Sequence, residues 1–504
     1  MNPGFPPARE EAPSSGLRVS IMMSTFLASA IHLLLLFRGF YSATLDESGR
    51  TLDAYNWVHG NETLATVWLP FYKIIVGGCL LIAPDLFVTP RVISFVFGVA
   101  ALCAIIWCAQ VLFNNRATTV LTGLIAAVFP ARAVLTVAPL AEIMFIAVLT
   151  SAVGFLSRWL FVGKQRDLWL SAVLLAVGSS IRYEGWIVAG VFALLVVVLS
   201  VSRSTMQKVS PQTGVGAILV SFSFVVFWIL LHLLEKGRAF GFVTGTTGRY
   251  TLIHGDSLYS LLWNNPLAQF VFQNAGTLNI IGVLSVVRCL RRDLSARAAA
   301  SFPFVALVLV SLVALLGKGM PTHGFWRIPT VWSVLLIPYT ADWFGSRVDL
   351  SRELKGFKTF AMVAVLVCLL ALCLFGTFSM TEHSAFSRDD LAAGRYIHSQ
   401  LVQSPGPHNV LIESEIWSYV NVMVASQHPE WFILNSGVDP TEHRTPLLDP
   451  DKAFDPAALR QMGVTLLVFR REDFKDYLGT KAQVKGLEEF GPWTVYAFPS
   501  SPGP

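Results

Sequence analysis

The chain has 504 residues, of which 54% are apolar and only 14% are charged, and its mean hydropathy is +0.59. About a quarter of the residues in an ordinary soluble domain are charged, so this composition excludes that class. The net charge of +5 is modest, and we expect no nucleic-acid partner. Several apolar runs reach the roughly 20 residues needed to cross a bilayer. The composition therefore predicts a polytopic membrane protein.

The N-terminal segment, residues 1–16, is rich in Pro, Ser and Glu and predicts a disordered cytoplasmic tail. The apolar run at 17–37 begins like a signal peptide with a cleavage site at Ala28-Ser29-Ala30. It continues after that tripeptide for longer than a signal-peptide core does. We therefore expect an uncleaved first span.

Ten more apolar runs follow, which predicts about eleven transmembrane helices. They lie at 91–113, 117–130, 138–157, 168–181, 186–202, 214–234, 267–287, 300–316, 328–344 and 359–379. From a cytoplasmic N-terminus, this threading places nearly all the clustered Lys and Arg inside, as the positive-inside rule requires. It holds only if residues 68–83, which contain Pro70 and Gly77-Gly78, lie in the outer interface. A short outer turn is expected at 131–137.

The first outer loop, about residues 40–90, is far larger than a connection needs. It opens with Asp46 and Glu47 and carries Tyr55, Tyr72 and Lys73. A carboxylate held at the membrane rim suits a general base for an acceptor hydroxyl. The alternative is a helix N-terminus, where carboxylates are favoured by the helix dipole.

Glu142 stands at the outer mouth of the fourth span. An acid near a span usually faces a cavity or a charged partner, and Arg132 is the obvious candidate for that partner. Alternatively, Glu142 and Asp46 form a site for a divalent cation such as Mg²⁺ or Mn²⁺, which prefers hard oxygen ligands. Two carboxylates alone do not establish such a cofactor.

Two motifs carry cations on the outer side. Arg182-Tyr183-Glu184 joins two spans almost without a loop, and it is either an interfacial anchor with an internal Arg–Glu pair or part of the site. His323 and Arg327 enter a late span from outside, against the charge bias, and so require an anionic partner. An arginine fork matches a phosphate, which Lys73 could also contact. Anionic lipid headgroups are the alternative partner.

The tail, residues 381–504, predicts a small α/β domain outside the membrane. A helix follows Ser387, strands are expected at 410–412, 464–469 and 493–498, and Asp455-Pro456 begins a helix that ends at Gly463. The tail contains no catalytic constellation. A binding or lid role is therefore expected.

These motifs resemble the GT-C superfamily of polyprenyl-phosphate-sugar-dependent glycosyltransferases, and the nearest branch looks like bacterial relatives of protein O-mannosyltransferase and the aminoarabinose lipid A transferase. The resemblance rests on the acidic pair after the first span, the segment from Pro70 to Lys73, Arg91-Val-Ile-Ser, Glu142, Arg182-Tyr-Glu and His323…Arg327. The sequence departs from the family in three ways. Lys73 follows the proline, whereas in the aminoarabinose branch a lysine tends to precede it, and Glu142 replaces the commoner Asp. The eleven expected spans are fewer than the thirteen of the best-known members.

The resemblance implies an all-α, GT-C-like membrane domain at 17–380 and an extracytoplasmic α/β domain at 381–504, in a bacterial cytoplasmic membrane. It implies an inverting hexosyl- or pentosyltransferase that uses a lipid donor like dolichyl phosphate mannose. The acceptor hydroxyl would belong to a protein, a lipid or a cell-envelope glycan. Asp46, with Glu47 and Glu142, would be catalytic, and Lys73, Arg327, His323 and Arg182 would bind the donor phosphate; Tyr55, Tyr72, Tyr183 and Glu184 are further candidates.

Two other classes stay open. A transporter or lipid-carrier flippase is also polytopic with charges near its spans, but such proteins usually have internal repeats and polar sites at the bilayer midplane. We find no repeat, and the acids here gather at the outer rim. The other class is a membrane scaffold whose tail binds a partner.

Overall fold

The computed structural model divides into two compact units. It describes residues 15–201, 210–240, 276–291, 294–316, 327–347, 357–403, 409–414, 417–435, 447–449, 455–481, 484 and 486–498. Unit 1 comprises Met1–Leu35, Thr63–Tyr72 and Ile93–Glu382, and unit 2 comprises Leu36–Glu62, Lys73–Val92 and His383–Pro504. Most of the first outer loop thus belongs to the same unit as the tail.

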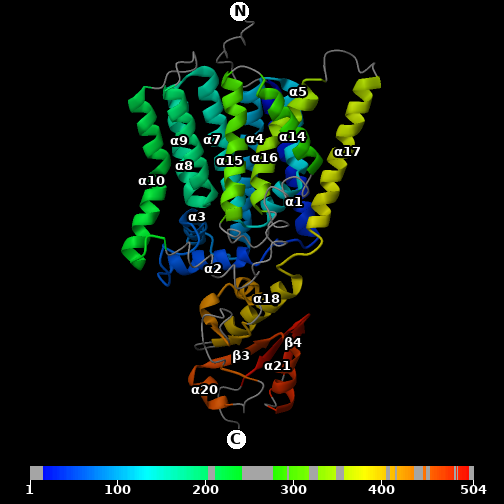
Figure 1. Ribbon diagram of the computed structural model, residues 1–504. Coiled ribbons are helices and arrows are strands. Elements are labelled where there is room, and N and C mark those ends of the chain that lie inside the picture. The colour runs from blue at the N-terminus through cyan, green and yellow to red at the C-terminus, as the bar shows by residue number, and fades with distance from the viewer. Residues whose placement is uncertain are drawn as a thin grey trace, which may run out of the picture. The chain divides into compact units, whose positions relative to one another are not determined.

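Unit 1 is a bundle of helices that run alongside one another (Figure 1). The last residues of α1 and the first turn of α4 belong to unit 2. The bundle consists of α1 (Ser15–Phe37), α4 (Val88–Phe113), α5 (Arg116–Val128), α6 (Pro130–Val137), α7 (Ala141–Val162), α8 (Gln165–Ile181), α9 (Glu184–Val201), α10 (Pro211–Lys236), α14 (Gly276–Cys289), α15 (Leu294–Leu316), α16 (Arg327–Gly345) and α17 (Phe357–Met380).

Six helices within the described residues are long and apolar enough to cross a membrane, and the bent pair α5–α6 would make a seventh. Helices also overlap the other expected runs, but within the described residues they do not meet the same length and hydropathy criterion. The protein is therefore a mostly helical chain with six or seven candidate spans. The count of about eleven stays a prediction.

Residues 131–137, which were expected to form a short turn, belong to helix α6, and α6 is bent by 56° from α5. Pro130 cannot donate a backbone hydrogen bond and forces the preceding Phe129 into an extended conformation, so α5 ends and α6 begins. Residues 131–137 form a buried helix. Arg132 turns back and donates to the carbonyls of Ala126 and Ala127 at the end of α5, which would otherwise be unsatisfied.

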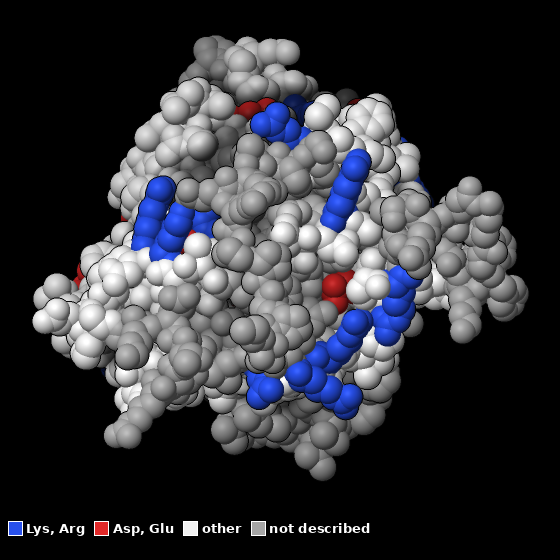
Figure 2. All heavy atoms as spheres, turned by 90° about the horizontal axis from the view of Figure 1, so that it is seen from above, with Lys and Arg blue, Asp and Glu red and all other residues white. Residues whose placement is uncertain are grey.

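Basic residues gather at one set of helix ends in unit 1. Exposed cations lie at the start of α1 and at the connections α4–α5, α7–α8, α14–α15 and after α16: Arg18, Arg116, Lys164, Arg166, Arg288, Arg291, Arg297 and Arg347. Figure 2 shows a face with many Lys and Arg and few acids. At α7–α8, Arg158 also forms a bidentate pair with the buried Asp167. The clustering is typical of a cytoplasmic face.

The clustering of basic residues predicts which side of the membrane each loop faces, and cysteine labelling tests this prediction. In a variant without native cysteines, we expect a cysteine at the exposed Asn61 to react with a membrane-impermeant reagent from outside intact cells. A cysteine at Gln165, exposed at the start of α8, should react only after permeabilisation. Labelling of Gln165→Cys in intact cells would contradict the topology and place α2 on the wrong side for a donor displayed outside.

Unit 2 contains the loop helices, a five-stranded sheet and the helices that cover it. Helix α3 is shared with unit 1, and its 11 residues are too few to cross a bilayer. The elements are α2 (Asp46–Val58), α3 (Pro70–Leu80), α18 (Arg388–Val402), β1 (Asn409–Ile412), α19 (Tyr419–Ser426), η1 (Pro429–Trp431), β2 (Phe432–Leu434), α20 (Pro456–Gln461), β3 (Val464–Phe469), α21 (Glu472–Asp476), η2 (Tyr477–Lys481), β4 (Gly486–Phe490) and β5 (Trp493–Ala497).

The sheet has the order β2-β1-β3-β5-β4, with β1 parallel to β2 and β3, and β5 antiparallel to its neighbours. Successive side chains of a strand point to opposite faces, so Val410 and Ile412 pack with α18 and α19 while Leu411 packs with α20 and α21. The predicted helix after Ser387 begins with a capping box in which Ser387 and Asp390 bond reciprocally. The two predicted helices and three predicted strands of the tail are present, whereas α19, α21, β2 and β4 were not predicted.

Candidate functional site

Helix α2 carries charged residues on one face. Asp46, Arg50 and Asp53 occupy positions i, i+4 and i+7, which lie on the same side of an α-helix. We call these three residues the α2 stripe. Ser48 and Tyr55 are about 180–200° away around the same helix and so lie on its opposite face.

The two adjacent acids that begin α2 differ in their surroundings. The Glu47 side chain is buried and accepts hydrogen bonds from the backbone N–H groups of Ala43 and Thr44, at 2.9 and 3.0 Å, and from the Thr44 hydroxyl. Burial raises the pKa of the Glu47 carboxyl, and the hydrogen bonds from Thr44 oppose that rise. Asp46 remains partly exposed. Glu47 therefore holds the chain before α2, and Asp46 is the more exposed of the two acids.

Asp53, which sequence reasoning did not single out, forms an ion pair with Lys73. The Lys73 Nζ lies 2.9 Å from Asp53 Oδ1, and both side chains are buried. The helices can approach because Gly77 has no side chain: a Cβ there would lie 2.7 Å from Val58 Cγ1. The spacing of seven residues from Asp46 could have indicated Asp53. Lys73 thus joins the α2 stripe.

The two tyrosines proposed from this loop make structural hydrogen bonds. The Tyr55 hydroxyl donates to Glu430 Oε2 at 2.9 Å, and burial together with this carboxylate raises the pKa of Tyr55. In unit 1, the Tyr72 hydroxyl donates to the Pro139 carbonyl at 2.9 Å. Tyr55 thus links α2 to η1, and Tyr72 links α3 to the segment before α7.

Unit 1 contains a buried ion cluster of Glu142, Arg182 and Glu184, which we call the Arg182 cluster. Arg182 follows the end of α8; its Nη1 bonds Glu142 Oε1, and its Nε and Nη2 lie 3.0 and 2.5 Å from Glu184 Oε1. Glu142 and Glu184 lie in the first turns of α7 and α9, where the helix dipole favours carboxylates. The partner of Glu142 is therefore Arg182, and Arg132 was the wrong expectation.

Aromatic residues surround the Arg182 motif. The Tyr183 hydroxyl donates to the Val67 carbonyl at 3.0 Å, and the Trp186 indole donates to the Ser179 carbonyl at the same distance. The Tyr183 and Trp186 rings meet edge to face, 5.2 Å apart. Gly185 allows the close turn, because a Cβ would lie 2.8 Å from backbone atoms of α8. These contacts hold the α8–α9 turn in place, and the interfacial role of the motif stays a prediction.

The remaining candidates lie partly outside the described residues. His323 is outside them, and Arg327 is the first residue of α16. Asp46 and Glu142, the proposed cation ligands, belong to different units. Among the residues that the structure describes, no group of three or more His, Cys, Asp or Glu is placed to hold a metal ion. The divalent-cation site therefore stays a prediction.

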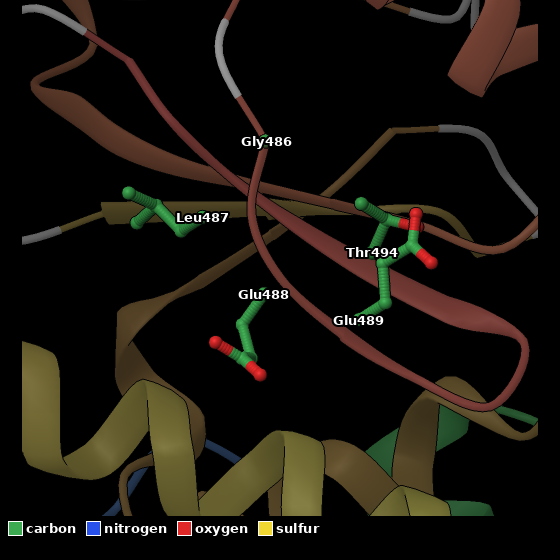
Figure 3. A pocket seen from close by; sticks show the side chains of 5 residues that line it. All are labelled: Gly486, Leu487, Glu488, Glu489 and Thr494. Carbon is green, nitrogen blue, oxygen red and sulfur yellow. The ribbon is translucent and has the colours of Figure 1, made fainter.

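A hollow of about 270 Å³ lies at the edge strand β4 (Figure 3). It is lined by Gly486, Leu487, Glu488, Glu489 and Thr494. The Glu488 and Glu489 side chains point to different sides of the strand. An acidic lining disfavours an anionic phosphate, so α2 and not this hollow is the candidate site.

A scan against family models finds no match, and a search of curated proteins finds none either. Solved structures are similar despite 13% sequence identity. The ArnT structure of Cupriavidus metallidurans bound to undecaprenyl phosphate matches with a TM-score of 0.61, covering 95% of this chain and 99% of that one. The apo Archaeoglobus fulgidus oligosaccharyltransferase matches with a TM-score of 0.52, covering 90% and 69%. Both are GT-C superfamily members, and the chain therefore has the fold of the GT-C superfamily.

Proposed function

We propose that the protein is a membrane glycosyltransferase that moves a sugar from a polyprenyl-phosphate-linked donor to an acceptor hydroxyl on the outer face. The observation that carries this proposal is the α2 stripe, where a partly exposed carboxylate shares one helix face with Arg50 and the Asp53–Lys73 pair. The shared fold favours a transferase over a transporter. Undecaprenyl phosphate bound to ArnT supports a donor of this class.

The reaction requires one base and a stabilised leaving group. Asp46 takes the proton of the acceptor hydroxyl while that oxygen attacks the anomeric carbon. The bond between the anomeric carbon and the phosphate oxygen breaks, and the polyprenyl phosphate leaves with both electrons. Because attack and departure occur on opposite faces of the sugar, the anomeric configuration is inverted. Glu47 contributes by holding the segment that precedes Asp46.

Cations near the base stabilise the charge that develops on the phosphate. Arg50 lies one helical turn from Asp46. Lys73 lies against the same helix through its ion pair with Asp53 and is the second proposed phosphate ligand. Arg327, His323 and Arg182 remain proposed phosphate ligands. The same proposal takes the sugar to be a hexose or a pentose and the acceptor to be a protein, a lipid or a cell-envelope glycan. It places the protein in a bacterial inner membrane with its tail outside.

The proposed contact of Lys73 with the donor phosphate can be tested separately from its structural ion pair with Asp53. Lys73→Met leaves the Asp53 carboxylate buried without its cation, so we expect lower stability. In the double variant Lys73→Met/Asp53→Asn the buried charge is gone, and stability should recover. Both variants should bind undecaprenyl phosphate about tenfold or more weakly, since a charge-assisted hydrogen bond contributes about 1.5–3 kcal/mol.

The measurement is binding of undecaprenyl phosphate to purified protein in nanodiscs, followed by sugar transfer from polyprenyl-phosphate-linked donors. Asp53→Asn alone is the control, because it keeps the cation. If the double variant binds undecaprenyl phosphate as the unmodified protein does, Lys73 only supports the fold. If the unmodified protein transfers no sugar from any such donor, the proposed function is wrong.

A further inference from the structure

The face of α2 opposite the stripe is bonded to the C-terminal part of unit 2. The Ser48 hydroxyl donates to Asn421 Oδ1 on α19 at 2.7 Å, and both side chains are buried. The chain positions are 373 residues apart. This contact lies two residues from Asp46, in the first turn of the helix.

Asn421 is the centre of a buried hydrogen-bond network. Its Nδ2 donates to the Ala385 carbonyl at 2.8 Å and to Asp390 Oδ2 at 3.0 Å. Asp390 in turn caps α18 and accepts from the Trp493 indole on β5 at 2.7 Å. The network therefore joins α2 to α18, α19 and the sheet, and every partner of the amide belongs to unit 2.

The segment that leads into α2 is held by the same part of the chain. The Ser384 hydroxyl oxygen accepts from the N–H groups of Tyr41 and Ser42, at 3.0 and 3.2 Å. The Ala385 N–H donates to the Ser42 carbonyl at 3.0 Å. The segment before α2 is thus bonded to Ser384 and Ala385, and the first turn of α2 is bonded to Asn421.

We infer that Asn421 is a positioning residue for Asp46, acting through Ser48 and the orientation of α2; this inference rests on the proposed function. A side-chain carboxylate lies about 6 Å from the helix axis, so a rotation of α2 by roughly 10° moves it about 1 Å. A misplacement of that size can cost about 100-fold in rate. A buried, fully bonded amide opposes such a rotation because its groups cannot exchange the bond for one with water.

The test compares Ser48→Ala, Asn421→Leu and their combination in a sugar-transfer assay, with rates expressed per folded protein. We expect each single change to lower kcat about tenfold to 100-fold, with the KM for the donor unchanged. The double variant should be no slower than the slower single variant, because both changes remove the same bond. Ser48→Ala leaves the other bonds of Asn421 intact, so it is informative even if Asn421→Leu fails to fold.

Glu430→Ala is the matched control. It also removes a hydrogen bond between α2 and the C-terminal part, but that bond is exposed, and water can replace it. Its turnover should be unchanged. Normal turnover per folded protein in Ser48→Ala, or losses that multiply in the double variant, would overturn the inference. Asp46→Asn in the same assay separates the two claims: if that variant is active, the proposed function fails; if it is inactive while Ser48→Ala is normal, only the positioning role fails.

Discussion

The Asp46→Asn variant should lose turnover by about 10²–10⁴-fold, the range expected for a general base. The amide keeps the size of the side chain and some of its hydrogen bonding but cannot accept a proton at working pH. Protein level and binding of undecaprenyl phosphate should stay close to normal. The measurement is sugar transfer by purified protein in liposomes, with kcat and the donor KM determined separately.

Glu47→Gln is the matched comparison, because the two acids are neighbours. Glu47 accepts backbone hydrogen bonds that an amide oxygen can partly keep, so its turnover should fall less. If Asp46 were a metal ligand, a chelator would silence the unmodified protein and added divalent cation would partly rescue Asp46→Asn. If it only favoured the helix N-terminus, the variant would keep its activity and lose about 1 kcal/mol of stability or less. Full activity of Asp46→Asn would refute the mechanism.

The second large effect is expected from Arg182→Met. This change leaves the buried carboxylates of Glu142 and Glu184 without the cation that both contact, and removing one partner from a buried ion pair costs about 3–5 kcal/mol. We expect a large drop in the thermal unfolding temperature in detergent. Adding Glu142→Gln and Glu184→Gln should recover much of the stability, because no uncompensated charge then remains.

Arg166→Met is a suitable control, since Arg166 is an exposed cation near the other end of α8. Its stability should change by no more than about 0.5 kcal/mol. Arg182→Met with normal stability would show that the cluster is not structural. Recovered stability together with lost donor binding in the triple variant would instead support the proposed contact between Arg182 and the donor phosphate.

Local signals in the sequence predicted two helices and three strands of the tail. Ser387 and Asp390 are three residues apart, and Asp455 precedes Pro456 directly, so each helix start depends only on neighbours. Strand β3 was likewise predicted from one apolar segment. Residues 131–137 were predicted as a turn but form helix α6, which Pro130 begins.

For the candidate site too, some features follow from the sequence and others only from the tertiary structure. The sequence by itself determined the membrane class, the polar loop after the first span and Asp46 as its candidate base, because composition and residue order carry that information. Only the tertiary structure decided that Glu142 pairs with Arg182, that Asp53 pairs with Lys73, and that Ser48 bonds Asn421. These partners are 20 to 373 residues apart, and any of several charges along the chain satisfies the same local pattern. Which of them meet depends on how the helices pack, since a buried charge or amide is stable only where packing supplies its partner.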